Sequence, residues 1–282
     1  MSASSTRGRG LSMRSVFSRV VLGVAVAAAV VVPAGAARAA GPQATTVLTL
    51  SFNMCGNKCN DGRLAVADDV AAAIANRDPK AATLQEVCAG QAQRLRARLG
   101  AAWTVKHVPT RHQCDDGSDY GIALAYRGES AWQRVWPLPN PGGHEPRKMV
   151  CAKLSGPDVL ACSTHIDFHA DGTRGAQIRE VARIMDDYAA AGHAAYVGGD
   201  FNTAPGDDQL DPLYRPAYGG GATGRHNEAG GCCTRDGAAT GDGGRKIDYV
   251  FGLAGRFTPG GIDVVASGLS DHREVWAKLV LG

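Results

Sequence analysis

Apolar residues recur along the chain in two patterns that alternate with each other. Short buried runs typical of β-strands occur at residues 47–53, 81–87, 103–108, 120–126, 148–154, 159–165, 194–199, 247–251, 261–266 and 275–281. Longer runs with a helical repeat occur at residues 63–76, 91–99 and 174–190. We find no internal repeat and no linker between two halves. The pattern therefore predicts a single α/β domain.

Residues 218–245 interrupt this alternation. The segment contains ten glycines and the adjacent pair Cys232 and Cys233, and it has little periodicity. A loop of this length in a compact domain is usually functional or mobile. A glycine-rich insertion without consequence is the alternative, and the sequence does not decide between the two.

The first 39 residues differ in composition from the rest. They contain five arginines, four of them before an apolar run of 13 residues at 20–32, and no lysine or acidic residue. Pro33 ends the run, and Ala-Arg-Ala at 37–39 supplies a cleavage site. These features predict a secretory signal peptide, a mature domain of residues 40–282 and a secreted protein. A membrane anchor is the alternative, but 13 residues fall short of the about 20 that span a bilayer.

The net charge changes once this segment is set aside. The whole chain has 30 basic and 27 acidic side chains, a formal charge of +3. Removing the five arginines of residues 1–39 leaves 25 basic against 27 acidic groups, so the mature protein carries about −2. Composition therefore excludes a strongly basic nucleic-acid-binding protein. Arg94, Arg96 and Arg98 form either a local basic patch or the solvated face of a helix.

All eight cysteines follow residue 39, and an even number in an exported chain predicts disulfides. The strands on either side of the turn at 155–158 place Cys151 opposite Cys162 if Leu154 faces Val159, which predicts a disulfide between them. For the others the pairing stays open: Cys59 and Cys88 can each pair with Cys114 or with the 232/233 couple. A zinc site is less favoured because no second pair of ligands matches these cysteine spacings.

Polar residues cluster where the predicted strands end. The clusters are Asn53, Gln85-Glu86, Thr164-His165, Asp200-Phe201-Asn202, Asp248 and Ser270-Asp271-His272. Each alone has a structural explanation, such as a turn, a helix cap or a hydrogen-bonded core histidine. Together they place carboxylates, amides and imidazoles after buried runs. Because strand ends in α/β folds converge on one edge, we expect these side chains to form a single site.

The motifs around these residues occur in a recognisable order. They are Ser51-Phe52-Asn53, Leu84-Gln85-Glu86-Val87, Ser163-Thr164-His165, Gly199-Asp200-Phe201-Asn202, Ile247-Asp248-Tyr249 and Ser270-Asp271-His272. From residue 47 to 280 the chain resembles the endonuclease/exonuclease/phosphatase superfamily, which has the deoxyribonuclease-I-like fold. The resemblance implies a four-layer α/β sandwich, with two mixed β-sheets packed face to face and helices outside. Members of the superfamily cleave DNA, RNA, phospholipids or inositol phosphates.

The resemblance also implies a divalent cation. Asn53 and Glu86 would hold it, with Asp271 nearby, and Mg²⁺ is the expected ion, with Mn²⁺ or Ca²⁺ as alternatives. Oxygen ligands of this kind suit a hard cation. The metal would act as a Lewis acid on the phosphate.

Catalytic roles follow from the same resemblance. His272 would be the general base or a phosphate contact, oriented by Asp248. His165 would donate to a phosphate oxygen or protonate the leaving group. Asp200 and Asn202 would position and polarise the attacking water.

Three further residues are candidates for binding the phosphate, and two positions depart from the family pattern. Arg147, Arg174 and Gln177 would contact the substrate, or else are solvated surface groups. Cys55 stands where some metal-dependent members carry an Asp, which favours a disulfide there over a second metal ligand. Ile122 stands where many members carry an Asn, so that one polar contact is missing.

The expected function is that of a secreted, divalent-metal-dependent phosphodiesterase, foremost a nuclease acting on DNA or RNA as a monomer without an obligate protein partner. One alternative is a lipid phosphodiesterase resembling secreted sphingomyelinases, for which Trp132 and Trp136 are the nearest candidates for a membrane-inserting hairpin. Another is a different phosphoesterase. A catalytically silent binding protein is disfavoured because the polar set is complete.

Overall fold

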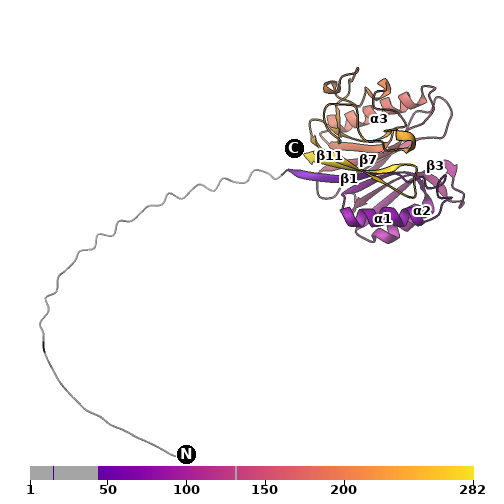
Figure 1. The fold of residues 1–282 in the computed structure, drawn as a ribbon, viewed down its shortest axis with the longest axis horizontal. Helices are drawn as coiled ribbons and strands as arrows, with labels where there is room; N and C mark the ends of the chain where they lie inside the picture. The colour runs from indigo at the N-terminus through magenta and orange to yellow at the C-terminus, as the bar shows by residue number, and fades with distance from the viewer. Residues whose placement is uncertain (1–14, 16–43, 131) are drawn as a thin grey trace, which may run out of the picture. The chain divides into compact units, whose positions relative to one another are not determined.

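Two six-stranded sheets form the centre of the computed structural model, which describes residues 15, 44–130 and 132–282 (Figure 1). The first sheet has the order β11 (Phe257–Ala266), β12 (Arg273–Leu281), β1 (Thr45–Asn53), β2 (Ala81–Cys88), β4 (Asp119–Arg127) and β3 (Trp103–Gln113). The second has the order β5 (Gln133–Pro137), β6 (Lys148–Lys153), β7 (Val159–His165), β8 (Ala194–Asp200), β10 (Asp248–Leu253) and β9 (His226–Glu228). The predicted signal peptide lies outside the described residues, apart from Ser15.

Helices cover the outer faces of both sheets. The first sheet is covered by α1 (Ala65–Arg77) and α2 (Ala89–Leu99), and the second by α3 (Thr173–Ala190), as Figure 1 shows. Each sheet is mixed, because β1 pairs with β2 and β7 with β8 in parallel while the other pairs are antiparallel. The predicted four-layer α/β sandwich is thus confirmed. None of the described helices has the length and apolar character needed to cross a bilayer.

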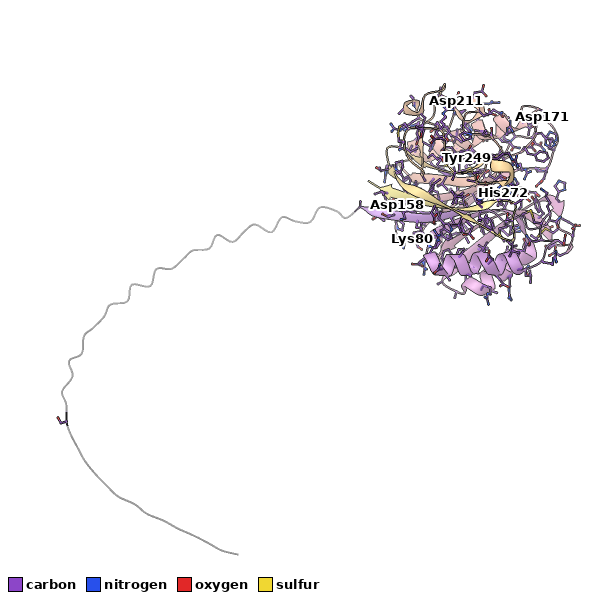
Figure 2. All side chains as sticks on the ribbon, in the orientation of Figure 1. Lys80, Asp158, Asp171, Asp211, Tyr249 and His272 are labelled. Carbon is purple, nitrogen blue, oxygen red and sulfur yellow. A yellow bond between two sulfur atoms is a disulfide. The ribbon has the colours of Figure 1, made fainter. Side chains whose placement is uncertain are left out.

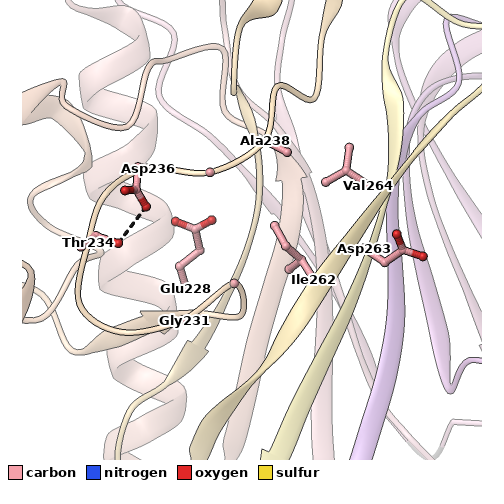
Figure 3. A pocket seen from close by; sticks show the side chains of 10 residues that line it. Glu228, Gly231, Thr234, Asp236, Ala238, Ile262, Asp263 and Val264 are labelled. Atoms are coloured by element: carbon pink, nitrogen blue, oxygen red, sulfur yellow. Dashed lines mark hydrogen bonds between the residues drawn. The ribbon is translucent and has the colours of Figure 1, made fainter.

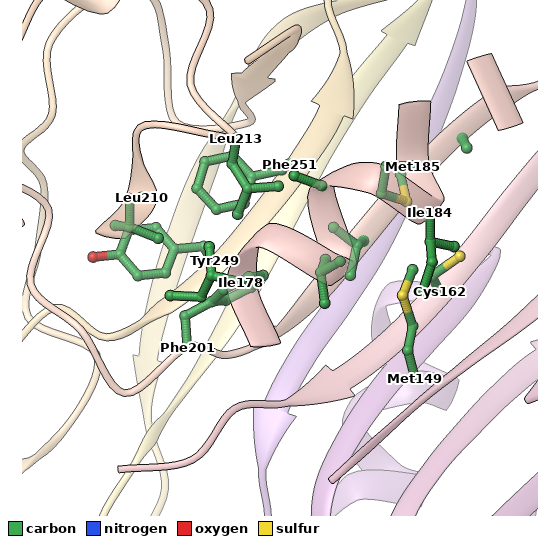
Figure 4. Close-up of a cluster of buried hydrophobic side chains, with 14 of the residues drawn as sticks. Met149, Cys162, Ile178, Ile184, Met185, Phe201, Leu210, Leu213, Tyr249 and Phe251 are labelled. Carbon is green, nitrogen blue, oxygen red and sulfur yellow. The ribbon is translucent and has the colours of Figure 1, made fainter. Parts of the chain in front are cut away.

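Three apolar layers hold the sandwich together, because each strand alternates its side chains between two faces. On β1, Leu50 and Phe52 pack toward α1 and α2, whereas Val47 lies between the sheets. The layer under α3 is the richest in aromatic rings. Figure 4 shows part of it, including Ile178, Met185, Phe201, Tyr249 and Phe251.

The layer between the sheets becomes polar toward one end. Thr49 of β1 accepts a hydrogen bond from the Tyr196 hydroxyl of β8 (3.0 Å). Further along, Ser51 and Thr83 lie against Gly198 so closely that a Cβ added to this glycine would be 2.5 Å from Thr83 Oγ1. Hydrogen bonds and close backbone approach therefore replace hydrophobic packing at the end of the sandwich where Asn53 lies.

All ten predicted strands and all three predicted helices are present, with two strands added. The sequence pattern missed β5, whose residues are mostly exposed, and β9, which has only three residues and lies in the glycine-rich segment. Both lie at edges of the second sheet, where a strand needs little apolar periodicity. The strands β3 and β11 are longer than the pattern indicated.

The glycine-rich segment, residues 218–245, is packed onto the domain. Tyr218, Ala222 and Glu228 are buried, and β9 pairs with β10. Three short 3-10 helices lie in and before it: η1 (Asp208–Leu210), η2 (Pro216–Tyr218) and η3 (Asp242–Gly244). The segment and β11 enclose a cavity of about 280 Å³ lined by acidic and small residues (Figure 3).

Four disulfides are present. Cys151 pairs with Cys162 across β6 and β7, as the hairpin register predicts. Cys88 pairs with Cys114, one of the alternatives that the sequence left open. The expectation that Cys59 pairs with Cys114 or the 232/233 couple is wrong. A tight turn, in which Cys59 N–H donates to the Cys55 carbonyl, brings Cys59 to Cys55, and Cys232 pairs with Cys233.

The close approach at Gly198 yields a stability prediction. Gly198→Ala should lower the free energy of unfolding by about 1–3 kcal/mol, the usual cost of overpacking, because the new methyl group meets Thr83 Oγ1. Chemical denaturation of Gly198→Ala, of Thr83→Ala and of the double variant measures the coupling between the two positions. In the Thr83→Ala background the Gly198→Ala penalty should shrink. Gly255→Ala, which adds a methyl group in open space, is the matched control, and equal penalties at Gly198 and Gly255 would contradict the prediction.

Candidate active site

Three neighbouring strands of the second sheet bring the first site residues together. His165 ends β7, Asp200 ends β8 and Asp248 begins β10. In the strand pairing His165 is opposite Asp200, and Asp200 is opposite Asp248. The pairing register, which the buried runs fix, therefore places an imidazole and two carboxylates side by side.

Asn53 supplies the contact from the first sheet. Its Nδ2 donates to Asp200 Oδ2 (3.1 Å) and to Glu86 Oε1 (2.9 Å). Its Oδ1 accepts the backbone N–H of Cys55 (3.0 Å), which fixes the orientation of the amide. Asn53 therefore links the carboxylates of both sheets, and one lone pair of Oδ1 is left for an ion.

His272 and Asp248 form a buried carboxylate–imidazole pair. His272 Nδ1 lies 2.9 Å from Asp248 Oδ2, and its Nε2 lies 3.7 Å from Asp200 Oδ2 (His272 is labelled in Figure 2). Burial by itself lowers the pKa of His272, but the hydrogen bond and charge of Asp248, with the charge of Asp200, outweigh it and raise the pKa to about 9. Ser270 Oγ accepts the backbone N–H of His272 and donates to the Asn53 carbonyl. The Ser-Asp-His motif is thus hydrogen-bonded to the end of β1.

His165 is held in one tautomer by Arg147. Arg147 Nη1 donates to His165 Nδ1 (2.7 Å), so that a neutral ring carries its proton on Nε2, which faces Asp200 Oδ2 at 3.5 Å. Burial, the charge of Arg147 and the charge of His272 lower the pKa of His165 well below its usual value. His165 is therefore a neutral hydrogen-bond donor.

Asp200 lies between the two imidazoles. Burial and the neighbouring charge of Asp248 raise its pKa to about 7, against the opposing effect of His272. The backbone N–H of Asn202 donates to Asp200 Oδ1 (2.8 Å), and the Asn202 side chain is fixed by a hydrogen bond to the carbonyl of Ile166 (3.0 Å). Asn202 has a φ of 50°, which asparagine tolerates better than most residues.

Glu86 leaves its strand in an unusual backbone conformation. It has a φ of 54° and lies where the pairing of β2 with β4 shifts register between Leu84 and Val87. A bulge of this kind turns a side chain out of its normal alternation. As a result the carboxylate of Glu86 is half-buried and reaches Asn53.

The surroundings of Glu86 favour a cation. Lys58 Nζ contacts Asp271 Oδ2 (3.0 Å), and this hydrogen bond, the charge of Asp271 and, more weakly, that of Glu86 raise the pKa of Lys58. Glu86, Asp271 and the free lone pair of Asn53 offer oxygen donors, which fit a hard divalent ion. A second group, Asp200, Asp248 and His272, has ligand atoms within 4.8 Å of one another.

The three residues predicted to contact the phosphate differ in how deeply they are buried and in what they contact. Arg147 is buried behind His165, so its interpretation as a solvated surface group is wrong. Arg174 is partly buried and donates to the carbonyl of Asn202 (2.8 Å). Gln177 is fully buried, and both atoms of its amide group are used within the protein. Ile122 is a core residue between the sheets.

One contribution to the site had no signal in the sequence. Thr240 Oγ1 accepts the backbone N–H groups of Ile247 and Asp248 and so fixes the start of β10. It lies in the glycine-rich segment, where no periodicity marks it. Such a residue can be found only from the three-dimensional structure.

Two cavities flank these residues. One of about 660 Å³ lies beside Asn202, and its lining includes four basic side chains, Arg174, Arg235, Arg245 and Lys246, and two acidic ones, Asp207 and Asp236. A smaller one of about 220 Å³ lies beside Glu86, with Lys58, His112 and Tyr120 in its wall. The cavity of Figure 3 has none of the site residues in its lining.

Comparison with known proteins identifies the family. Residues 50–272 match the sequence profile of the Endonuclease/Exonuclease/phosphatase family. The chain belongs to this family. Its members are hydrolases that act on phosphoester bonds, and they generally depend on divalent metals. No curated protein matched the chain in a sequence comparison.

Solved structures of this family share the fold. An endonuclease/exonuclease/phosphatase from Bacteroides vulgatus is 20% identical, with a TM-score of 0.66 over 84% of this chain and 100% of that one. The human Nocturnin catalytic domain, with bound sulfate, is 16% identical, with a TM-score of 0.67 over 84% and 95%. A Bacteroides thetaiotaomicron mannosyl-6-phosphatase is 16% identical, with a TM-score of 0.62 over 84% and 99%. At these identities the likeness establishes the fold alone.

The His272–Asp248 pair yields a pH prediction. In metal-free protein, Asp248→Asn should lower the pKa of His272 from about 9, because the carboxylate that stabilises the imidazolium is gone. Histidine NMR titration in EDTA measures this. The buried ring of His226, whose pKa burial lowers to about 4, is an internal control that should not change.

The same pair has a consequence for stability. A histidine pKa raised by folding adds stability that is fully present below the unfolded value, about 6.5, and is lost as the pH rises through the folded value. The free energy of unfolding of the wild type should therefore fall between pH 7 and 9, and that of Asp248→Asn should fall less. Parallel curves for the two proteins would show that the pair does not contribute.

Proposed function

We propose that the protein is an exported, divalent-metal-dependent phosphodiesterase whose substrate is nucleic acid, and that it acts as a monomer without an obligate partner. One observation carries the proposal. The Asp200 carboxylate has an imidazole nitrogen on each side, His165 Nε2 at 3.5 Å and His272 Nε2 at 3.7 Å, and Asn53 joins it to Glu86. General base, hydrogen-bond donors and cation ligands are thus within one connected network.

The cation belongs with the oxygen donors at the edge of this network. Glu86, Asp271 and Asn53 would hold it, and Mg²⁺ fits their chemistry. When bound, the ion supplies Lewis-acid stabilisation of the charge on the phosphate. Asp200, Asp248 and His272 are already engaged with one another by hydrogen bonds and charge, so we assign them to proton transfer and phosphate binding.

The protein's own residues then divide the remaining work. Asp200, whose pKa of about 7 suits a base at neutral pH, takes the proton of the attacking water, and Asn202 helps to position that water. His165 donates its Nε2 proton in a hydrogen bond to a phosphate oxygen. His272, as the imidazolium that Asp248 stabilises, neutralises charge as the leaving oxygen departs.

Two surface features support nucleic acid as the substrate. Phe168, three residues after His165, is 60% exposed and stacks on His169 with ring centroids 4.0 Å apart, as an aromatic base-stacking group does. In the cavity beside Asn202, Arg174, Arg235 and Lys246 each lie within 4 Å of a carboxylate, whereas Arg245 is exposed and can contact a phosphate chain.

A membrane-inserting hairpin, in contrast, is not formed by the two tryptophans considered for it. Trp136 Nε1 donates to the Tyr188 hydroxyl (2.8 Å), and Trp132 packs edge-on against the same ring. Both are only partly exposed and lie against the layer under α3. The lipid alternative therefore has less support than nucleic acid.

Export is supported by the cysteines. All eight form disulfides, which persist in oxidising compartments. This agrees with the signal peptide predicted over residues 1–39 and with a mature domain of residues 40–282. Amino-terminal sequencing of the protein recovered from culture medium tests both the export and the cleavage point.

A substrate panel with two site variants tests the activity. His165→Ala and His272→Ala should each lower Mg²⁺-dependent hydrolysis by about 10²–10⁴-fold, the usual contribution of a positioned acid–base group. The panel comprises plasmid DNA, single-stranded DNA, RNA, sphingomyelin, inositol phosphates and a sugar phosphate, each with Mg²⁺ and with EDTA. His193→Ala, in the turn between α3 and β8 and beside Tyr188, is the matched control and should keep full activity.

The outcomes separate the alternatives. Hydrolysis of nucleic acid alone supports the proposal. Hydrolysis confined to sphingomyelin or phosphomonoesters overturns the substrate assignment but leaves the assignment of metal-dependent phosphoester hydrolysis intact. Full activity of either site variant, or equal activity in EDTA, would refute the catalytic assignment itself.

Phe168→Ala tests base stacking directly. Loss of one stacked base is worth about 1–3 kcal/mol, so KM for a single-stranded oligonucleotide should rise roughly 5- to 150-fold. KM for a small phosphodiester without a base should stay the same, and Phe168→Trp should restore oligonucleotide binding. A similar change in KM for both substrates would argue against a stacking role.

A further inference from the structure

Two loops that flank the active site bring four metal-ligand side chains together. His144 lies in the loop between β5 and β6, and Asp167, His169 and Asp171 lie in the loop that follows β7. One ligand atom each of His144, Asp167 and His169 lies within 4.8 Å of the others. His144 Nε2 is 2.6 Å from Asp171 Oδ2, so that a fourth ligand adjoins the group (Asp171 is labelled in Figure 2).

Asp167 is the buried member of this cluster. Its side chain is fully buried, and its Oδ1 accepts both the backbone N–H and the ring Nδ1 of His169 (2.7 Å each). Its Oδ2 is buried as well and has no hydrogen-bond partner among the described residues. A buried carboxylate oxygen without a partner is costly, and a cation is one group that removes the cost.

We propose that His144, Asp167, His169 and Asp171 form a second metal site, for a divalent transition metal of the zinc type. Two imidazoles and two carboxylates match the donor set and the four-coordinate preference of Zn²⁺, whereas Mg²⁺ and Ca²⁺ prefer oxygen ligands. The two rings are stacked, with centroids 3.7 Å apart, and they would have to rotate out of this stack for their in-plane lone pairs to converge on one ion. The site shares no residue with the oxygen donors around Glu86 and does not depend on the proposed function.

The two loops are already tied together beneath the cluster. Gln177 of α3 accepts the backbone N–H of Asp167 (2.8 Å) and donates to the carbonyl of Pro139 (3.0 Å). Thr173 Oγ1 accepts the backbone N–H of Gly142 (3.1 Å). The backbone that carries the four ligands is therefore preorganised, which lowers the cost of binding an ion.

The position of the site indicates a structural role. Asp167 lies two residues after His165, and His144 lies three residues before Arg147, which donates to His165 Nδ1. A metal that joins the two loops braces both sides of this contact. We therefore expect it to stabilise the fold and to hold His165 in place, without contact with the substrate phosphate.

Metal titration of the full mature protein tests the proposal. After EDTA treatment and removal of the chelator, the wild type should bind one Zn²⁺ per chain more than His144→Ala/His169→Ala, measured by calorimetry. Zn²⁺ should raise the melting temperature of the wild type but not, or much less, that of the double variant. With Co²⁺ as the probe, the wild type should show the visible bands of a four-coordinate site, and the double variant should lack them.

Two control variants separate this site from the catalytic one. Glu86→Gln removes the negative charge of a ligand proposed for the catalytic cation and should retain the Co²⁺ bands. His193→Ala removes a histidine outside the cluster and should bind as the wild type does. Asp171→Asn changes a partly exposed ligand. Because loss of an outer-shell partner already lowers metal affinity by about 10- to 100-fold, this variant should weaken Zn²⁺ binding by more than about tenfold. This variant keeps the test decisive if the double variant is unstable without metal. Equal Zn²⁺ stoichiometry and equal Co²⁺ spectra in the wild type and the cluster variants would overturn the proposal.

Discussion

The burial of one carboxylate between two sheets is the constraint on which the site depends. Asp200 is almost inaccessible to solvent, so its charge must be balanced by partners within the protein. These partners come from both sheets: Asn53 from the first, and His165 and the Asn202 backbone from the second, with His272 entering just before β12. A change in how the sheets face each other alters the contacts of Asp200 with Asn53 and His272 together. Fold and chemistry are therefore coupled at this residue.

The two sheets are held together differently along their length. At one end the apolar layer between them packs as an ordinary core, with Val47 and Leu279 among its members. Toward the site the contacts are hydrogen bonds, and Gly198 lets the sheets approach closely. Hydrogen bonds are directional, whereas apolar packing tolerates small shifts. The polar end can thus fix the site residues more accurately than a hydrophobic layer would.

The sequence alone predicts where a residue lies in the fold when that place follows from the local pattern of buried residues. Strands β7 and β8 are buried throughout and β1 is buried from Thr49 to Asn53, and this pattern alone assigns the polar residues at their ends to one edge of the fold. Gln177 shows the limit of this reasoning. Its position near the start of α3 suggested a phosphate contact, yet it is buried beneath the two loops that it joins, and only their tertiary packing determines that. The Arg147–His165 contact is of the same kind, since it depends on how β6, which follows Arg147, pairs with β7.

Glu86 shows what the site costs the fold. With a φ of 54° it occupies a conformation that glycine adopts freely and that strains a side chain bearing Cβ by roughly 1–2 kcal/mol. A glycine at this position would relax the bulge but remove the carboxylate that Asn53 holds. At this one residue the chain keeps a carboxylate in the site and accepts a lower thermodynamic stability of the fold. Stabilisation by sequence optimisation, which favours glycine at such positions, would select directly against catalysis here.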